Sequence, residues 1–278
     1  MHVDLHCHSY CSDGILSPEA LMSSANAAGV RIIALTDHDT VAGVPEARRC
    51  AQKLGMTLVN GIEFSGSWQG RDVHIVGLGF DLDHPVLQEA IAVQQAARAE
   101  RAEQIGERLT RAGIPGSLAG ALAEADGAQP GRPHFARYLV AQGHVKSMSA
   151  AFKRYLGKGK VGDVRHQWPP MEDIIAWLHQ AGGVAVLAHP AKYGLTRTKM
   201  CAMIGAFSEA GGDALEVISG RQVLSLTQDL ARIAAANGLA SSCGSDFHQP
   251  NQPWQALGQF DPLPENCRPV WQLPALGC

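Results

Sequence analysis

Short runs of apolar and β-branched residues alternate along most of the chain with longer stretches that repeat apolar residues at helical spacing. The short runs predict strands, and the longer stretches predict helices between them. The predicted strands are Val3–Leu5, Arg31–Leu35, Thr57–Ile62, Val73–Phe80, Gly183–Leu187, Ala214–Ile218 and Leu239–Cys243. Because strands that alternate with helices are typical of βα units, we expect an α/β protein with a parallel sheet or barrel.

Capping and stop residues mark the ends of several predicted helices. Ser17 is an N-cap residue followed by proline, and Gly29 ends the same helix. Further helices are predicted at about Pro45–Leu54, Met171–Gln180 and Val223–Asn237.

The middle of the chain departs from this alternation. From about Pro85 to Arg111 it is rich in Ala, Gln, Glu and Arg at helical spacing, and no strand pattern returns before Gly183. Residues 98–165 are therefore predicted to form a helical insertion. It would divide one barrel domain into the segments 1–97 and 166–278.

The composition narrows the class of protein. The 278 residues are 46% hydrophobic with a net charge of -3, so the chain can bury a core and lacks the basic excess of a protein that coats duplex DNA. No apolar run approaches the roughly 20 residues of a membrane span. Met1-His2-Val3-Asp4 does not open a basic region followed by an apolar stretch, so we do not expect export by a signal peptide. Seven cysteines without CxxC spacing are typical of reduced thiols, so we expect a cytoplasmic location. The oligomeric state is left open.

Histidine and acidic residues gather where the predicted strands end. They are His6 and His8 after the first strand, Asp37, His38 and Asp39 after the second, Glu63 after the third, His189 after the fifth, and Asp246 and His248 after the last. Since the carboxyl ends of parallel strands meet at one edge of a barrel, these side chains are expected to share one active site.

The spacing and type of these residues indicate metal binding. His6 and His8 are two residues apart, as are Asp246 and His248, so each pair faces one side of an extended chain. Nitrogen and oxygen ligands favour Mn, Fe or Zn over a metal that selects thiolates. The candidates exceed the needs of one ion, so two or three ions are expected. Neighbouring carboxylates would orient the ligands, Asp37 and Asp39 acting on His38, and Glu216 acting from within its strand.

Seven motifs run from the first strand to near residue 250. They are Asp4-Leu5-His6-Cys7-His8, Ser12-Asp13-Gly14, Thr36-Asp37-His38-Asp39, Gly61-Ile62-Glu63, His74-Ile75-Val76-Gly77, Ala188-His189-Pro190 and Gly244-Ser245-Asp246-Phe247-His248. Together they resemble the polymerase-and-histidinol-phosphatase (PHP) family of metal-dependent phosphoesterases. The resemblance implies a distorted (β/α)7 barrel that holds three divalent ions, Mn²⁺ first, with Zn²⁺ or Fe²⁺ as alternatives.

The resemblance also implies a role for each ligand. The first ion would be held by His6, His8, Glu63 and Asp246. Glu63 would bridge to a second ion bound by His74 and His134, the latter from the insertion motif Gly131-Arg132-Pro133-His134-Phe135-Ala136-Arg137. The third ion would be held by Asp13, His38 and His248. The catalytic residues would be Glu63, as the bridge, and His189, as a general acid or phosphate contact.

The insertion resembles one branch of the family, the bacterial 3′,5′-nucleoside bisphosphate phosphatases, which are related to 5′→3′ exonucleases of short RNA. The substrate contacts expected on that basis are Arg98, Arg101, Gln104, Arg132 and Lys192. Arginine can bind phosphate through two hydrogen bonds, although the same residues could simply solvate a helix. The basic run Lys153, Arg154, Lys158, Lys160 and Arg165 is expected to be a solvated face, with a polynucleotide contact as the alternative.

The branch resemblance implies a phosphatase that removes the 3′-phosphate of a nucleoside 3′,5′-bisphosphate such as pAp, with short RNA as a further substrate. One alternative is histidinol-phosphate phosphatase, which an acidic rather than arginine-lined second pocket would favour. The other is a non-catalytic nucleotide-binding regulator, which would have lost ligand residues. No ligand residue is missing from the motifs.

Overall fold

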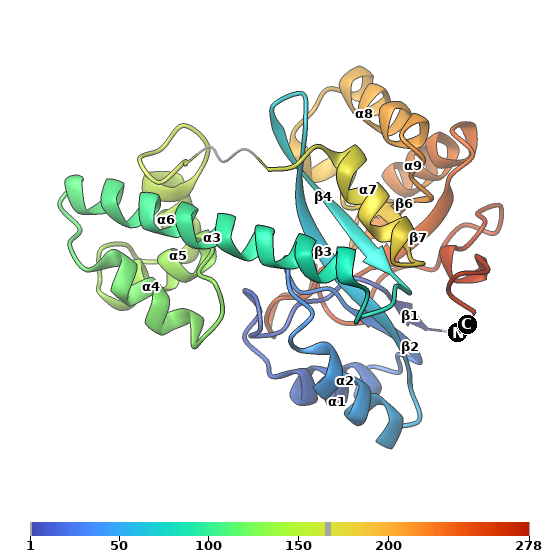
Figure 1. Ribbon diagram of the computed structural model, residues 1–278, viewed down its shortest axis with the longest axis horizontal. Coiled ribbons are helices and arrows are strands. Elements are labelled where there is room, and N and C mark those ends of the chain that lie inside the picture. The colour runs from blue at the N-terminus through green and yellow to red at the C-terminus, as the bar shows by residue number, and fades with distance from the viewer. Residues whose placement is uncertain (1, 165–167, 278) are drawn as a thin grey trace.

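Seven strands follow one another around a single sheet in the computed structural model, which describes residues 2–164 and 168–277. The strands are β1 (Val3–Asp4), β2 (Ile32–Leu35), β3 (Thr57–Trp68), β4 (Arg71–Leu78), β5 (Val184–Leu187), β6 (Ala214–Ser219) and β7 (Ala240–Gly244). The amide of Leu5 donates to the carbonyl of Cys243 at 3.0 Å, and Cys7 forms a bridge with Phe247, so the first and last strands also meet. The predicted distorted barrel is confirmed (Figure 1).

One strand, β4, departs from the fully parallel arrangement. β1, β2 and β3 are parallel, as are β5, β6 and β7, but β4 is antiparallel to both of its neighbours. A two-residue turn joins β3 to β4, and both Gln69 and Gly70 have positive φ, as in the tight turns that suit a twisted hairpin. Because β4 runs backwards, its beginning rather than its end lies at the edge where the parallel strands finish.

Helices cover the outside of the barrel. They are α1 (Pro18–Ala27), α2 (Val44–Lys53), α7 (Met171–Gln180), α8 (Arg197–Glu209) and α9 (Leu224–Ala236), with short 3₁₀ turns at Pro190–Tyr193 and Val270–Gln272. The predicted cap of α1 is present, because the Ser17 hydroxyl accepts the Ala20 amide at 3.1 Å. The sequence pattern does not predict α8, although Met200, Met203 and Phe207 all point inward at helical spacing. No helix within the described ranges is long and apolar enough to cross a membrane.

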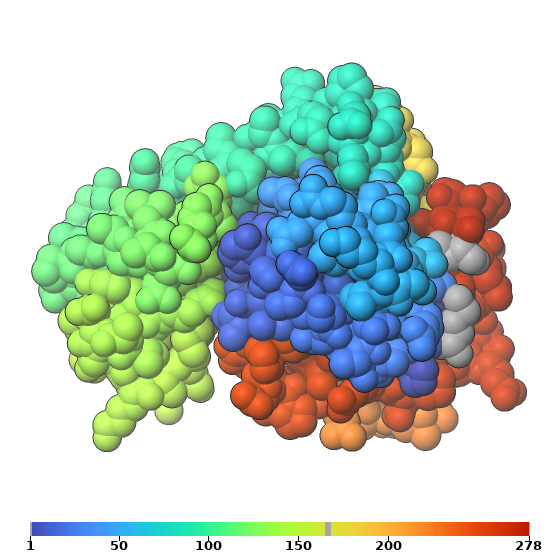
Figure 2. Space-filling model, turned by 90° about the horizontal axis from the view of Figure 1, so that it is seen from below, coloured from blue at the N-terminus to red at the C-terminus, as the bar shows by residue number. Residues whose placement is uncertain are grey.

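The predicted insertion is helical and lies to one side of the barrel (Figures 1 and 2). It comprises α3 (Pro85–Arg111), α4 (Ser117–Ala125), α5 (Arg132–Ala141), α6 (Met148–Ala151) and a π-helical turn at Phe152–Leu156. α3 serves both parts of the molecule, since Leu87 and Ala90 join the barrel core whereas Ile105 and Leu109 join a separate core of the insertion. The first predicted boundary, 97/98, therefore falls within one continuous helix. The second, 165/166, lies outside the described residues, and the division stays a prediction.

Candidate metal centre

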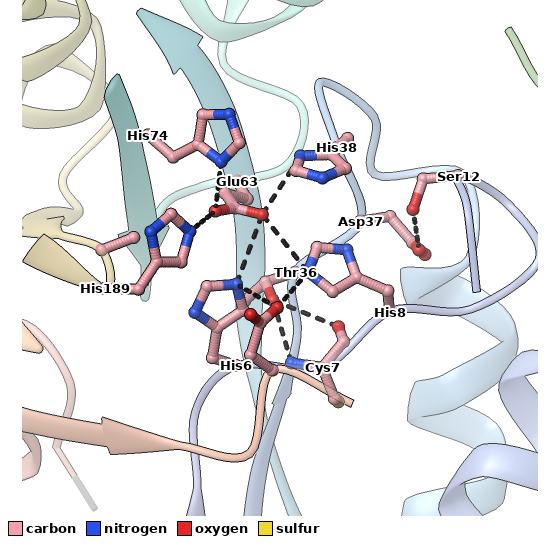
Figure 3. A network of polar contacts seen from close by, with 12 residues as sticks. His6, Cys7, His8, Ser12, Thr36, Asp37, His38, Glu63, His74 and His189 are labelled. Atoms are coloured by element: carbon pink, nitrogen blue, oxygen red, sulfur yellow. Dashed lines mark hydrogen bonds and ion pairs between the residues drawn. The ribbon is translucent and has the colours of Figure 1, made fainter. Parts of the chain in front are cut away.

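All the predicted ligands except His134 converge at one edge of the barrel, and Figure 3 shows His6, His8, His38 and His74 around the carboxylate of Glu63. Glu63 lies inside β3, which continues six residues beyond the predicted strand end, and its side chain is 1% exposed. The loops after β1, β2, β5 and β7 supply most of the other ligands. His74 comes from the beginning of β4, opposite Ser65 of β3, because that strand is reversed.

The two oxygens of Glu63 face different sets of imidazole rings. Oε2 lies 3.1 to 3.3 Å from one nitrogen of each of three rings, His6, His8 and His38. Oε1 lies 2.8 Å from Nδ1 of His74 and 2.9 Å from Nε2 of His189. This arrangement suits a carboxylate that bridges two cations.

Two aspartates complete the arrangement. Asp246 Oδ1 lies 3.6 Å from His6 Nε2 and 3.4 Å from His8 Nε2. Asp13 lies 3.3 Å from His248 Nε2 and 3.8 Å from His38 Nε2, through its two oxygens. Four overlapping groups can each hold an ion: His8, Asp13, His38 and His248; His6, Glu63 and His189; His6, His8 and Asp246; and His38, Glu63 and His74.

The donor atoms fit divalent metal ions. His6 Nε2, His8 Nε2, His38 Nδ1 and Glu63 Oε2 are buried and have no hydrogen-bond partner among the described residues. A buried polar atom without a partner is costly unless a ligand satisfies it. Two ligand atoms each about 2.1 Å from one ion lie roughly 3.0–3.4 Å apart, close to the separations seen between these atoms. The site therefore has the donors and the spacing that metal ions require.

Residues behind the ligands orient them. Glu216 accepts a hydrogen bond from His6 Nδ1 at 2.9 Å, which directs Nε2 into the site and leaves it as the atom available to a metal ion. The other oxygen of Glu216 accepts the amide of His189 at 2.6 Å. The predicted supporting role of Glu216 matches these contacts. No sequence motif points to Tyr193, whose hydroxyl accepts the His74 amide at 2.8 Å and donates to the Ala188 carbonyl.

The backbone is strained at three residues of the site. Asp39, His189 and Asp246 all have positive φ, at 53°, 28° and 53°. Non-glycine residues adopt this region at an energetic cost, and such residues concentrate at functional sites. The strain turns these side chains out of the regular strand direction.

The charges of the cluster depend on one another. Burial opposes ionisation of Glu63, but the charges of His38, His6 and His74 outweigh it and hold the pKa of the carboxyl well below its usual value. Burial likewise opposes protonation of His8, but the nearby carboxylates of Asp246 and Glu63 raise the pKa of its ring to about 10. The pKa values of His6 and His248 are also raised, whereas burial lowers the pKa of His38, so a cation that binds beside His6, His8 or His248 must displace a proton.

His134 and His189 occupy different positions from those that the resemblance implies. His134 belongs to none of the four groups found in residues 2–164 and 168–277, whereas His189 belongs to one and contacts Glu63. The Nδ1 atom of His134 accepts the Gly131 amide at 2.9 Å, so Nε2 carries the hydrogen and can donate but not ligate. Burial and then the charge of Arg137 lower the pKa of His134 to about 4, so the ring is neutral.

Asp37 and Asp39 do not contact His38 through their carboxylates, contrary to expectation. Asp37 accepts hydrogen bonds from Ser9 and Ser12 and so holds the loop that carries Asp13. Asp39 accepts the Ser65 amide at 2.7 Å. The positive φ of Asp39 accounts for this, because it turns the side chain toward β3 and α3.

The three predicted substrate-binding arginines lie near one another, and Arg98 adjoins the metal centre. Arg98 donates to Asp39 at 2.5 Å and to the Ser65 hydroxyl at 2.8 Å, and so adjoins His38 and His74. The guanidinium groups of Arg98 and Arg101 lie 5.7 and 5.9 Å from the ring of Trp168. Burial, and then the charges of Arg132 and Arg98, lower the pKa of Arg101 to about 10. These mutually repelling cations form a site suited to an anion.

The remaining predicted contacts are more dispersed. Gln104 is half-buried on α3 and donates to Glu100 at 3.1 Å, and among the described residues it forms no hydrogen bond with the predicted arginines. Lys192 donates to Asp246 Oδ2 at 2.5 Å, which places it at the edge of the metal centre. Four basic residues of the insertion are exposed: Lys153, Arg154, Lys158 and Lys160. Arg165 lies outside the described residues.

Arg137 belongs to the insertion motif but is not among the predicted site residues. It donates to the Asp13 carbonyl at 2.9 Å, and its buried Nε has no hydrogen-bond partner among the described residues.

Comparison with known proteins gives consistent results. The family model of the PHP domain matches residues 4–181. A 5′-3′ exoribonuclease of Haemophilus influenzae is 45% identical over 97% of both chains, and a 3′,5′-nucleoside bisphosphate phosphatase of Chromobacterium violaceum is 43% identical over 98% of this chain and 95% of its own. A solved structure from Chromobacterium violaceum, described as an amidohydrolase with bound sulfate and no metal, superposes with a TM-score of 0.92 at 43% identity, covering 98% of this chain and 95% of its own.

Proposed function

This chain belongs to the PHP domain family, and from that premise we propose that it is a metal-dependent phosphatase of nucleoside 3′,5′-bisphosphates such as pAp. The observation that carries the proposal is the arginine group Arg98, Arg101 and Arg132 beside the metal centre. A substrate with two phosphates needs one site for the reacting phosphate and a second cationic site for the other. The Chromobacterium violaceum relative supports this substrate class through its name.

We assign three ions to the ligands, with Mn²⁺ as the first choice and Zn²⁺ or Fe²⁺ as alternatives. His6, His8, Asp246 and one oxygen of Glu63 would hold the first ion. The other oxygen of Glu63 would hold the second with His74 and His189, since both rings lie within 2.9 Å of Oε1. The third would be held by Asp13, His38 and His248. His189 thus takes the ligand role that the resemblance implied for His134.

The protein's own groups would bind and orient the substrate. Divalent ions bound here would lower the pKa of water and neutralise negative charge on the transferring phosphoryl group. Lys192, at the rim beside Asp246, can donate to a phosphoryl oxygen. His134, neutral and carrying its hydrogen on Nε2, can donate to an anion without being a base at neutral pH. Arg98, Arg101 and Arg132 would hold the 5′-phosphate.

Short RNA with a 5′-phosphate is a second candidate substrate, favoured by the name of the Haemophilus influenzae relative. Histidinol phosphate is a poorer candidate, because its amine and imidazole would face arginines rather than acidic residues. The six cysteines within the described residues are all free thiols, which supports the proposed cytoplasmic location.

Phosphate release tests the proposal directly. Protein purified with Mn²⁺ is assayed against pAp, 5′-AMP, 3′-AMP and histidinol phosphate. The proposal expects pAp to be hydrolysed with the highest kcat/KM and 5′-AMP to accumulate. Faster turnover of histidinol phosphate than of pAp would contradict it.

A further inference from the structure

Two connected cavities lie beside the metal centre, next to β6 and α9 rather than the insertion. A cavity of about 170 Å³ opens between the loop after β5 and the loop after β6, and His189, Glu216 and Lys192 form its inner end. A second cavity of about 350 Å³ shares Arg221 and Gln222 with the first and continues outward along the loop near Phe260. Together they reach the size of sites that hold small organic ligands, roughly 300–1,000 Å³.

The lining of the first cavity suits a nucleoside joined to a phosphate. Leu226 and Leu230 of α9 provide an apolar wall. Lys192 and Arg221 provide positive charge, and the guanidinium of Arg221 is exposed and forms no ion pair within the described residues. The Ser219 hydroxyl oxygen is buried and has no hydrogen-bond partner there either. The Glu216 carboxylate at the inner end accepts hydrogen bonds from His6 Nδ1 and from the His189 amide. These two donors offset its negative charge and so weaken its repulsion of an anion in the cavity.

The chemistry of the proposed function explains why such a region would be needed. When a 3′-phosphate is hydrolysed, water oxygen bonds to phosphorus, the P–O3′ bond breaks, and the 3′ oxygen takes up a proton. The same bond is broken when the first nucleotide of a 5′-phosphorylated RNA is released as a 5′-monophosphate. The two substrates differ at one oxygen of the reacting phosphate, which in RNA carries the next nucleoside. An enzyme that accepts both must leave space beside that oxygen.

We propose that the cavity lined by Lys192, Ser219, Arg221 and Leu226 binds the nucleoside that follows the scissile phosphate of a short RNA. This inference rests on the proposed function. The arginine group on the insertion side would hold the 5′-phosphate, the ions would hold the scissile phosphate, and the cavity would hold the rest of the strand. The shortened product would itself carry a 5′-phosphate and could be bound again.

Two variants on different loops test the cavity against pAp and the 5′-phosphorylated dinucleotide pApA. Ala191 lines the cavity and is exposed, so Ala191→Phe adds bulk there without disturbing the core. Arg221→Glu reverses the unpaired charge. Each should lower kcat/KM for pApA about tenfold or more and change kcat/KM for pAp less than about threefold.

Matched controls are available outside the cavities. Arg232→Glu reverses an exposed arginine of α9 that lines neither cavity, and Ala119→Phe adds the same bulk to an exposed position of α4. Both controls should leave the two activities unchanged. The inference is overturned if Ala191→Phe and Arg221→Glu lower both activities equally or neither, or if wild-type protein hydrolyses pAp but not pApA. Wild-type protein that hydrolyses neither substrate would instead reject the proposed function.

Discussion

Glu63 connects more of the candidate ligands than any other single residue described, because its two oxygens face five imidazole rings. A carboxylate in this position can serve two ions at once, whereas each histidine offers one nitrogen. Glu216, although equally buried, contacts the ligands from behind and faces no ion directly. The two residues are therefore a matched pair for separating ligation from orientation.

Glu63→Gln is expected to abolish turnover and to lower the metal content, because an amide cannot bridge two cations as a carboxylate does. Glu216→Gln should keep the ions and reduce activity by about 10- to 100-fold, as is typical when a residue that orients a ligand is changed. Elemental analysis and phosphate release on the same preparations would measure both effects. A fully loaded Glu63→Gln protein would refute the bridging role.

His189 and His134 should respond differently to the same substitution. His189→Asn is expected to lose about one ion per chain, since its Nε2 is 2.9 Å from Glu63. His134→Asn should retain all ions and lose roughly tenfold to a hundredfold in kcat/KM for pAp through a lost hydrogen bond to an anion. Metal content decides between the roles, and the reverse pattern would restore His134 as the ligand.

Metal affinity should rise with pH between about 6 and 9. His8 has a pKa of about 10 in the metal-free protein, above its ordinary 6.5, so an ion must displace a proton from the ring. The folding stability of the metal-free protein should change with pH in the opposite direction. The stability that charged His8 contributes is complete below pH 6.5 and is lost as the pH rises through 10. Calorimetric titration in buffers of different ionisation enthalpy would count the protons released. Affinity independent of pH would contradict this account.

At the scale of elements, the reversed strand β4 and the long helix α3 build the site. The two-residue turn after β3 returns the chain at once, so His74 stands beside Glu63 from the next strand. α3 extends from the barrel core into the core of the insertion, and Arg98 and Arg101 lie between the two cores. One helix thereby places cations beside metal ligands that come from the strands.

The arginines of α3 and α5 should distinguish substrates by their number of phosphates. Arg101→Ala and Arg132→Ala each remove a charge-assisted contact, worth about 1.5–3 kcal/mol, or roughly tenfold to a hundredfold in kcat/KM for pAp. Turnover of 3′-AMP should fall much less, because its only phosphate is the reacting one. Arg111→Ala, 77% exposed at the end of the same helix, serves as the control. Equal losses on both substrates would assign these arginines to the reacting phosphate or to the fold.

At the scale of the whole molecule, charge is divided between the two parts. Residues 98–165 contain 12 Lys and Arg against six Asp and Glu, whereas the rest of the chain contains 11 against 20. The acidic excess of the barrel includes Asp13, Glu63 and Asp246. These carboxylates lie close together in the interior, and cations must neutralise them because a buried charge without a partner is costly. The insertion supplies positive charge on the side where an anionic substrate is proposed to bind.

Removal of metal should destabilise the entire barrel, because the proposed ligands come from six of its strands or the loops that follow them. Each ion, at a free concentration a hundredfold above its Kd, raises the free energy of unfolding by about 2.7 kcal/mol. This corresponds to an increase in Tm of about 5 °C. We expect Tm to fall in a chelator and to recover with added Mn²⁺ in a concentration-dependent way. Thermal unfolding followed by circular dichroism would measure this, and a Tm unaffected by chelation would argue against ions that tie the strands together.

The sequence by itself determined the seven strands, most helices and nearly all of the candidate ligands. Apolar periodicity defines α7 without error, since a helix buries a stripe of fixed period. Motifs that follow strands indicate His6, His8, Asp246 and His248, because parallel strands finish at one edge. These features depend on residues that are close together in the chain, so local spacing is enough to reveal them.

Only the tertiary structure decided how distant residues combine. The tautomer of His134 depends on the Gly131 amide, and the approach of His189 to Glu63 joins residues 126 positions apart. The reversal of β4, the turn of Asp39 toward Ser65 and the cavity beside Lys192 likewise arise from packing between segments. Spacing along a chain cannot reveal such contacts, because they are set by where the folded backbone brings each side chain.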